Sequence, residues 1–200
     1  MIPLPYQSTL YGSIYWIACL IWLVPEWNGA ALQSAEHKRE AANVQDRGSM
    51  YALIGLLWVG LFLNFALPNF TPWATITWHR TAVFFIGIAC ILLGVALRWY
   101  AIWSLGRYFT RDVAVSSDQQ VVQSGPYHFI RHPAYSGTLL AMVGFGLGMT
   151  NWVSLAVIVI FNLIGHLYRV RVEERALSQT IGRPYVEYMK HTKRFVPFVF

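Results

Sequence analysis

Five apolar segments, most of them long enough to cross a bilayer, constrain the fold of this chain more than any other feature. They run Ser8–Trp27, Met50–Leu67, Thr81–Leu105, Tyr135–Thr150 and Trp152–Tyr168. A helix needs about 20 apolar residues to cross the hydrocarbon core, with roughly 17 as the lower limit. An α-helix also satisfies its own backbone polar groups, as lipid requires. We therefore expect an all-α integral membrane protein.

The last two segments are shorter and are separated only by Asn151, which predicts a tight helical hairpin. A buried soluble hairpin is the alternative, but the other three segments already place the chain in lipid. Composition agrees, because 12% of the residues are charged, about half the fraction usual for a soluble domain. There is no internal repeat and no linker. We expect residues 1–200 to form a single membrane domain with about five transmembrane helices and a helical C-terminal tail.

The distribution of Lys and Arg predicts the orientation of these helices. Arg80 is the one basic residue of 15 that falls on the side where the chain begins, and seven follow Tyr168. Basic residues concentrate on the cytoplasmic side, so we expect the N-terminus outside and the C-terminus in the cytoplasm. Arg98, near the end of the third segment, is either an interfacial snorkelling residue or a pocket residue. The net charge of +6 then reflects topology and contact with membrane lipids. It indicates no nucleic acid, and no segment calls for an obligatory protein partner.

The fifth segment carries a polar face. Asn162, His166, Arg169 and Glu173 are spaced four, three and four residues apart, so they share one side if the helix continues past Tyr168. Polar groups at membrane depth usually face a bundle interior or a cavity. Helix–helix hydrogen bonding by Asn162 and snorkelling by Arg169 are the alternatives.

The C-terminal tail contains clear helix signals. The stretch RVRVEERALSQTIG has helix formers throughout, and Gly182 predicts the end of the helix. Pro184 suits the first turn of a second short helix, PYVEYMKH. The Glu173–Glu174 pair would then lie on a helix that leaves the bilayer, near the point where residues 125–137 enter it.

Those residues, GPYHFIRHPAYSG, form the most polar stretch beside an apolar helix. The residue before a proline is disfavoured in the helical region, so His132 should be extended and Pro133 should begin the fourth helix. His128 and His132 have the spacing of helical metal ligands, but this break separates them, and we expect no metal site. The N-terminus of the fourth helix carries partial positive charge and free N–H groups, which suit a carboxylate or another anion.

The fourth segment also has a glycine face. Gly144 and Gly148 form a GxxxG pair, and Gly137 lies seven residues before Gly144. Such a face allows close helix packing, and we expect the fifth segment to be its partner. That packing would line a cytoplasmic pocket with Arg131, His132, Tyr135, Arg169, Glu173 and Glu174. Mixed charge of this kind fits a zwitterionic or polyfunctional small molecule.

Five stretches resemble the isoprenylcysteine carboxyl methyltransferase family in order and spacing. They are LRWYAIWSLGRYFT, VVQSGPYHFIRHPAYSG, RVRVEERAL, GRPYVEYMK and RFVP, within residues 94–197. The RHPxYxG element followed by two glutamates is specific, although related membrane methyltransferases of phospholipids and thiols share it. The resemblance implies methyl transfer from S-adenosylmethionine, bound from the cytoplasm, to an amphiphilic acceptor that arrives through the bilayer. Residues 94–197 would form the catalytic core, and residues 1–80 would be accessory transmembrane helices.

The resemblance also implies roles for individual residues. The cofactor site would comprise Val122, Gly125, Tyr127, His132, Pro133, Tyr135, Glu173, Glu174 and Tyr185, and the catalytic residues would be Arg131, Arg169 and Glu173. Tyr188 and Arg194 would help to close the site. Gln120 stands where the family often has histidine, so no side-chain contact is carried over to that position.

The sequence leaves open which chemical group accepts the methyl. A carboxylate, as on a prenylated cysteine or an analogue, is already ionised at neutral pH and is best oriented by an arginine. A lipid amine or a thiol would need a base, for which His132 is the candidate. A nicotinamide-dependent membrane reductase, distantly similar to sterol reductases, and a non-catalytic membrane protein are the alternative functions. The compact chain is similar to prokaryotic members, so we expect it in a prokaryotic plasma membrane.

Overall fold

The computed structural model describes residues 2–28, 48–109 and 120–196. These residues form the α-helices α1 (Thr9–Asn28), α3 (Ser49–Ala66), α4 (Arg80–Leu105), α5 (Pro133–Gly148), α6 (Trp152–Thr180) and α7 (Arg183–His191). Short 3-10 turns η1 (Leu4–Tyr6), η2 (Leu67–Asn69), η3 (Pro72–Ala74), η4 (Gly106–Tyr108) and η5 (Gly125–His128) connect them. Within the described ranges the only β-type pairings are isolated bridges. The all-α prediction is confirmed.

Three helices are long and apolar enough to cross a membrane: α3 together with η2, α4, and α6. The apolar part of α1, Thr9–Leu23, is shorter, and α5 has 16 residues. At 1.5 Å per residue α5 is about 24 Å long, less than the roughly 30 Å of a bilayer core. The chain is an integral membrane protein, whereas its predicted total of five spans stays a prediction.

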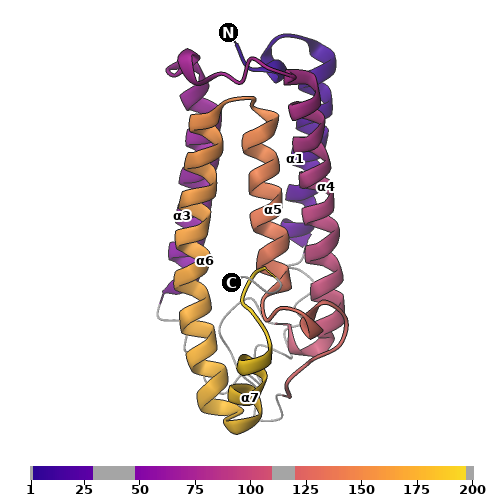
Figure 1. Cartoon of the computed structure of the whole chain (residues 1–200), viewed down its shortest axis with the longest axis vertical. Coiled ribbons are helices and arrows are strands. Elements are labelled where there is room, and N and C mark those ends of the chain that lie inside the picture. Colours follow the sequence, from indigo (N-terminus) through magenta and orange to yellow (C-terminus); the bar gives the residue numbers. More distant parts are fainter. Residues whose placement is uncertain (1, 29–47, 110–119, 197–200) are drawn as a thin grey trace.

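The long helices lie side by side as an elongated bundle (Figure 1). Within it, α5 packs chiefly against α4, and α6 packs chiefly against α3. The predicted hairpin between α5 and α6 is present. Asn151 caps α6 by accepting hydrogen bonds from the backbone N–H groups of Val153 at 3.0 Å and Ser154 at 3.1 Å, which satisfies donors that a helix start leaves open.

Glycines bring α4 and α5 into close contact. A Cβ added at Gly94 would lie 2.5 Å from the carbonyl oxygen of Gly137, and one at Gly144 would lie 2.5 Å from that of Gly87. The prediction that this glycine face packs on α6 is therefore wrong. The two pairs have the same seven-residue spacing, so two flat helix faces match in register, whereas α6 contains the single glycine Gly165.

The bundle has two distinct ends. Near the end where the chain begins, the Tyr15 hydroxyl of α1 donates a hydrogen bond to the Phe145 carbonyl of α5 at 3.0 Å and accepts one from Asn64 of α3 at 3.4 Å. At the other end, α6 continues past Tyr168 as predicted, Gly182 adopts a positive φ of 72°, and α7 follows. We call this second end the α7 end (Figure 1).

Candidate active site

The start of α5 is built as the proline predicts. Pro133 begins the helix, and His132 leaves helical geometry with φ −126° and ψ 58°. Upstream, Gly125 has a φ of 57°, and a Cβ there would lie 2.9 Å from the Ser104 hydroxyl of α4. Only glycine suits both the left-handed backbone and the close approach. The η5 turn is thereby seated against α4, which directs residues 130–132 towards α6.

Glu174 of α6 is held by cations from two other segments. Its Oε1 accepts a hydrogen bond from Arg131 Nε at 2.9 Å, and its Oε2 accepts one from Arg194 Nη2 at 2.7 Å. The Nε2 atom of His132 lies 3.5 Å from Oε1. Only 9% of the Glu174 side chain is exposed. A buried carboxylate requires cationic hydrogen-bond partners of this kind. Glu174 therefore joins α6 to the two segments that carry Arg131 and Arg194.

The residues after α7 form a strap that runs beside the start of α5. We define this C-terminal strap as residues 192–196. The backbone N–H groups of Arg131 and His132 donate to the carbonyls of Lys193 at 2.7 Å and Arg194 at 3.1 Å. The Ser136 hydroxyl donates to the Phe195 carbonyl at 2.6 Å. These hydrogen bonds fix the strap parallel to residues 130–132.

Arg131 supports the same strap with its side chain. Beyond the Glu174 contact, its Nη1 donates to the carbonyl of Met189 at 3.1 Å and to that of Thr192. The guanidinium is thus engaged on three sides by the protein itself. Its predicted role in orienting an acceptor stays a prediction, and the geometry favours a role in holding the C-terminal strap.

Glu173, the neighbouring carboxylate, faces a different set of groups. It accepts a hydrogen bond from the Tyr135 hydroxyl of α5 at 2.9 Å, and 29% of its side chain is exposed. The Tyr135 oxygen also accepts from Arg169 Nε at 3.5 Å, and Arg169 Nη1 donates to the Ser49 hydroxyl of α3 at 2.9 Å. Arg169 is only 2% exposed. One line of contacts therefore joins α5, α6 and α3.

Two histidines enclose the Tyr135 ring. The His132 ring stacks on it with centroids 5.6 Å apart, and the His166 ring meets it edge-on at 5.1 Å. The Nδ1 of His166 lies 2.7 Å from the Asn162 carbonyl, which makes this nitrogen the donor. Asn162 and His166 are buried on the predicted polar face. His132 Nε2 is buried, and it lies 3.5 Å from Glu174 Oε1 without good hydrogen-bond geometry.

Three tyrosines at the α7 end remain neutral phenols. Burial, and next the negative charge of Glu173, raise the pKa of Tyr127 and Tyr185 well above the usual value. Burial raises the pKa of Tyr188 to about 12, and its hydroxyl donates to the Tyr127 carbonyl at 2.6 Å. The hydrogen bond to Glu174 raises the pKa of Arg194 despite its partial burial. At neutral pH these three tyrosines are therefore uncharged and Arg194 is charged.

Arg98 lies on the side of α4 that faces α5. Its Nη1 donates to the Thr138 hydroxyl at 3.0 Å and to the Ala134 carbonyl at 3.4 Å, both on α5. The side chain thus crosses from α4 to the helix that carries Tyr135, and its role as a pocket residue stays a prediction. Val122 and Tyr127 pack on the same side, against Ala101 and Ala134.

The predicted residues largely converge. Arg131, His132, Tyr135, Arg169, Glu173 and Glu174 form one contiguous set of contacts, with Tyr185 within electrostatic reach of both glutamates. Sequence reasoning missed Ser49, which contacts Arg169, and the contact of Ser136 with the strap. Ser49 lies in no motif, and Ser136 occupies a variable position of the RHPxYxG element, so no sequence signal singles out either serine.

Part of the chain is similar in sequence to known membrane methyltransferases. A sequence profile of the isoprenylcysteine carboxyl methyltransferase (ICMT) family matches residues 86–179. Protein-S-isoprenylcysteine O-methyltransferase B of Arabidopsis thaliana is 36% identical over 115 residues, 56% of this chain and 58% of that protein. The protein-S-isoprenylcysteine O-methyltransferase of Saccharomyces cerevisiae is 29% identical over 116 residues, 57% of this chain and 48% of that protein.

A solved structure matches as well. That of the eukaryotic intramembrane Ras methyltransferase ICMT is 26% identical, with a TM-score of 0.56 over 72% of this chain and 51% of that one. The chain thus spans about half the length of these relatives. The matched residues include α5, the preceding Arg131–His132 corner and the glutamate pair of α6. Residues 86–179 thus resemble the isoprenylcysteine carboxyl methyltransferase family in sequence, and the fold is similar to that of a solved member of it.

Proposed function

We propose that this protein methylates the carboxylate of an amphiphilic acceptor, such as a prenylated cysteine or an analogue, using S-adenosylmethionine. Relatives that share its core are named protein-S-isoprenylcysteine O-methyltransferases. The observation that carries the proposal is the contact line Glu173–Tyr135–Arg169, which brings an accessible carboxylate and a buried guanidinium together between α5 and α6. A polar site at the end of apolar helices suits an acceptor that partitions into the bilayer.

The residues of the site fit the proposed cofactor. S-Adenosylmethionine supplies an activated methyl group, and it carries a carboxylate, an ammonium group and ribose hydroxyls. His132 Nε2 is a buried polar atom whose contact with Glu174 Oε1, at 3.5 Å, lacks good hydrogen-bond geometry, so among the described residues it keeps capacity for one of these groups. Glu173 is partly exposed and accepts a hydrogen bond from Tyr135, which leaves it acceptor capacity for an ammonium or a hydroxyl.

The two glutamates then have separate roles. Glu174 is enclosed by Arg131 and Arg194 and holds the C-terminal strap. Glu173 is the more exposed of the pair and is the one we assign to the cofactor. Gly125, Tyr127, Pro133 and Tyr185 complete the same end of the site by shaping the turn and supplying neutral phenols. Val122 contributes apolar packing through Tyr127.

Arg169 is the arginine that we assign to orienting the acceptor carboxylate. A carboxylate is ionised at neutral pH and needs orientation but no base. The donors of Arg131 point at Glu174 and at the main chain of the tail, whereas Arg169 lies beside Tyr135 at the membrane side of the site. Arg98 presents a second guanidinium to the same stretch of α5. Fixed donors of this kind align reactants and exclude water, which accounts for most of the acceleration that such a site can provide.

The proposal also concerns placement in the cell. The basic α7 end would face the cytoplasm, with the cofactor reaching the site from that side and the acceptor from the bilayer. Support comes from the uneven distribution of Lys and Arg. A prokaryotic plasma membrane is the location that we propose.

The test is labelled methyl transfer in detergent or proteoliposomes, with a prenylated cysteine analogue as acceptor. Glu173→Gln should lower cofactor affinity at least tenfold, because the neutral amide loses charge-assisted hydrogen bonds. Glu187→Gln is the matched control, since Glu187 is an exposed glutamate of α7 that pairs with Lys190, and it should behave as the wild type. Equal affinity in both variants would contradict the assignment of Glu173. Turnover of a reduced nicotinamide in place of the methyl donor would overturn the function itself.

A further inference from the structure

The interface between α3 and α6 keeps one antiparallel register from end to end. At the end opposite α7, the Ser154 hydroxyl of α6 donates a hydrogen bond to the Asn64 carbonyl of α3 at 3.1 Å. At the α7 end, Arg169 Nη1 of α6 donates to the Ser49 hydroxyl of α3 at 2.9 Å. Each step along α6 between these two contacts is matched by an equal step back along α3, as expected for two helices of equal rise that run in opposite directions. The helix packing therefore places Ser49 opposite Arg169.

A close approach of the two backbones brings Ser49 within reach of Arg169. One turn before Arg169, a Cβ added at Gly165 would lie 3.1 Å from Leu53 Cδ1 and 3.4 Å from Leu53 Cα. Leu53 lies one turn after Ser49 on α3. Ser49 is fully buried although it is the first residue of its helix, whereas Tyr51 is exposed. The start of α3 is thus turned so that its hydroxyl faces α6.

The Arg169 guanidinium is held by hydroxyl groups of two other helices. The hydrogen bond to Tyr135 is long, at 3.5 Å from Nε, whereas the one to Ser49 has the usual length of 2.9 Å. An arginine side chain has many rotamers, so a guanidinium that binds a ligand gains when its orientation is fixed in advance. A serine hydroxyl fixes that orientation and brings no negative charge of its own, unlike Glu174 beside Arg131.

We propose that Ser49 is a positioning residue, which holds the Arg169 guanidinium in the orientation that binds the acceptor carboxylate. This inference rests on the assignment of Arg169 to the acceptor under the proposed function. Ser49 lies outside residues 86–179, the stretch that matches the family profile, and within residues 1–80, which the sequence predicts to be accessory helices. On this proposal α3 is part of the acceptor site.

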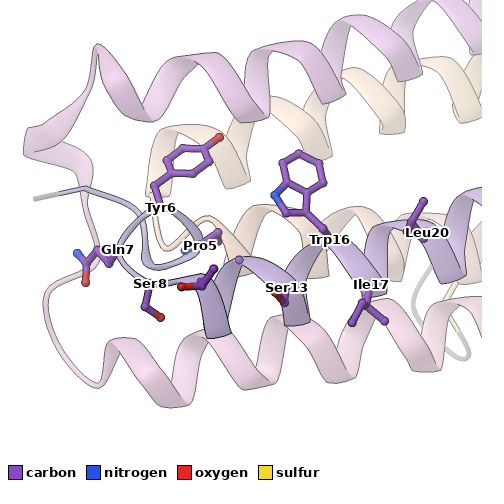
Figure 2. Close-up of a pocket in the computed structure, with 10 residues that line it drawn as sticks. Pro5, Tyr6, Gln7, Ser8, Ser13, Trp16, Ile17 and Leu20 are labelled. Atoms are coloured by element: carbon purple, nitrogen blue, oxygen red, sulfur yellow. The ribbon is translucent and has the colours of Figure 1, made fainter.

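The same interface offers a matched control. Ser154 is also a fully buried serine with a hydrogen bond between α6 and α3, but it lies about 22 Å from Arg169 along α6. The hollow beside the first half of α1 (Figure 2) lies at that far end too, and its lining between Pro5 and Leu20 includes no residue of α3 or α6. Ser154→Ala should therefore remove a comparable hydrogen bond without affecting the acceptor.

The test is labelled methyl transfer to a prenylated cysteine analogue, with kcat and the acceptor KM measured separately. Ser49→Ala should raise the acceptor KM about tenfold, because a hydrogen bond to a charged group is lost. Its kcat and its dissociation constant for S-adenosylmethionine should stay close to the wild type. Ser154→Ala should lower the midpoint of thermal unfolding as much as Ser49→Ala does and keep the wild-type KM. In an Arg169→Lys background, Ser49→Ala should leave the KM unchanged, since the serine acts through the guanidinium.

A wild-type acceptor KM in Ser49→Ala would overturn this inference and leave the proposed function intact, because the wild type would still methylate the analogue. An equal rise of the KM in Ser154→Ala would show a general loosening of the α3–α6 interface, and it would overturn the inference as well. So would a loss of cofactor affinity in Ser49→Ala, which would assign Arg169 to the cofactor. Absence of methyl transfer by the wild type would instead overturn the proposed function, and this inference with it.

Discussion

At the scale of single residues, two adjacent glutamates have opposite surroundings. Successive residues on a helix point about 100° apart, so Glu173 turns to Tyr135 while Glu174 turns to Arg131 and Arg194. The exposed fraction falls from 29% to 9% between them. The same helix turn thus provides one partly exposed carboxylate, which we propose for the cofactor, and one buried carboxylate that contacts residues of the C-terminal strap.

Arg131→Ala tests the structural role of that arginine. The change leaves a buried carboxylate with fewer partners and frees the strap, and truncation of one partner in such a pair costs roughly 2–5 kcal/mol. We expect a lower midpoint of thermal unfolding in detergent. Arg183→Ala, at an exposed position at the start of α7, should leave the midpoint unchanged. Lost activity with a wild-type midpoint would show instead that Arg131 acts on the acceptor.

At the scale of helices, the position of Tyr135 depends on how α5 lies against α4. The backbones approach so closely at Gly94 and Gly137 that a Cβ at either would collide with the other helix. Arg98 adds a polar contact across the same interface through Thr138. The rigid α4–α5 pair presents the start of α5 to α6, so packing between helices sets the geometry of the site.

Gly94→Ala should disturb this interface. The added methyl would lie 2.5 Å from the Gly137 carbonyl, and overpacking of this kind costs about 1–3 kcal/mol. Gly55→Ala is the control, because a Cβ at Gly55 of α3 meets nothing within 4 Å and alanine favours the helix by up to about 1 kcal/mol. Thermal unfolding should show a loss for the first variant and no loss for the second. Equal midpoints of unfolding for the two variants would contradict the close approach of α4 and α5 at Gly94.

At the scale of the whole molecule, the chain separates its chemistry between two ends. The α7 end holds the ion pairs of Arg131 and Arg194 with Glu174, whereas the opposite end presents exposed aromatic residues. Apolar helices connect them. The methyl transfer that we propose would need a place that both water and lipid reach, and the α7 end, where charged residues adjoin apolar helices, fits this requirement.

Cysteine labelling tests the proposed orientation. Phe70→Cys and Lys190→Cys place a thiol at exposed positions of the two opposite ends, in a background where Cys19 and Cys90 are replaced by alanine. In sealed right-side-out vesicles, a membrane-impermeant maleimide should label Phe70→Cys alone. Permeabilised vesicles should label both, which controls for reactivity. Labelling of Lys190→Cys in sealed vesicles would reverse the orientation.

The sequence by itself predicted the helices. It also predicted that the RHPxYxG element and the Glu173–Glu174 pair lie close together. Apolar length predicts the helices, Pro133 predicts the start of α5, and Gly182 predicts the end of α6. These signals act between residues that are close in the chain, so they can be interpreted without coordinates. The tertiary structure decided that the glycine face packs on α4, that Arg131 supports the strap, and that Ser49 contacts Arg169. Partner choice depends on whether two distant surfaces match in shape and hydrogen bonding, and no local pattern in either helix contains that information.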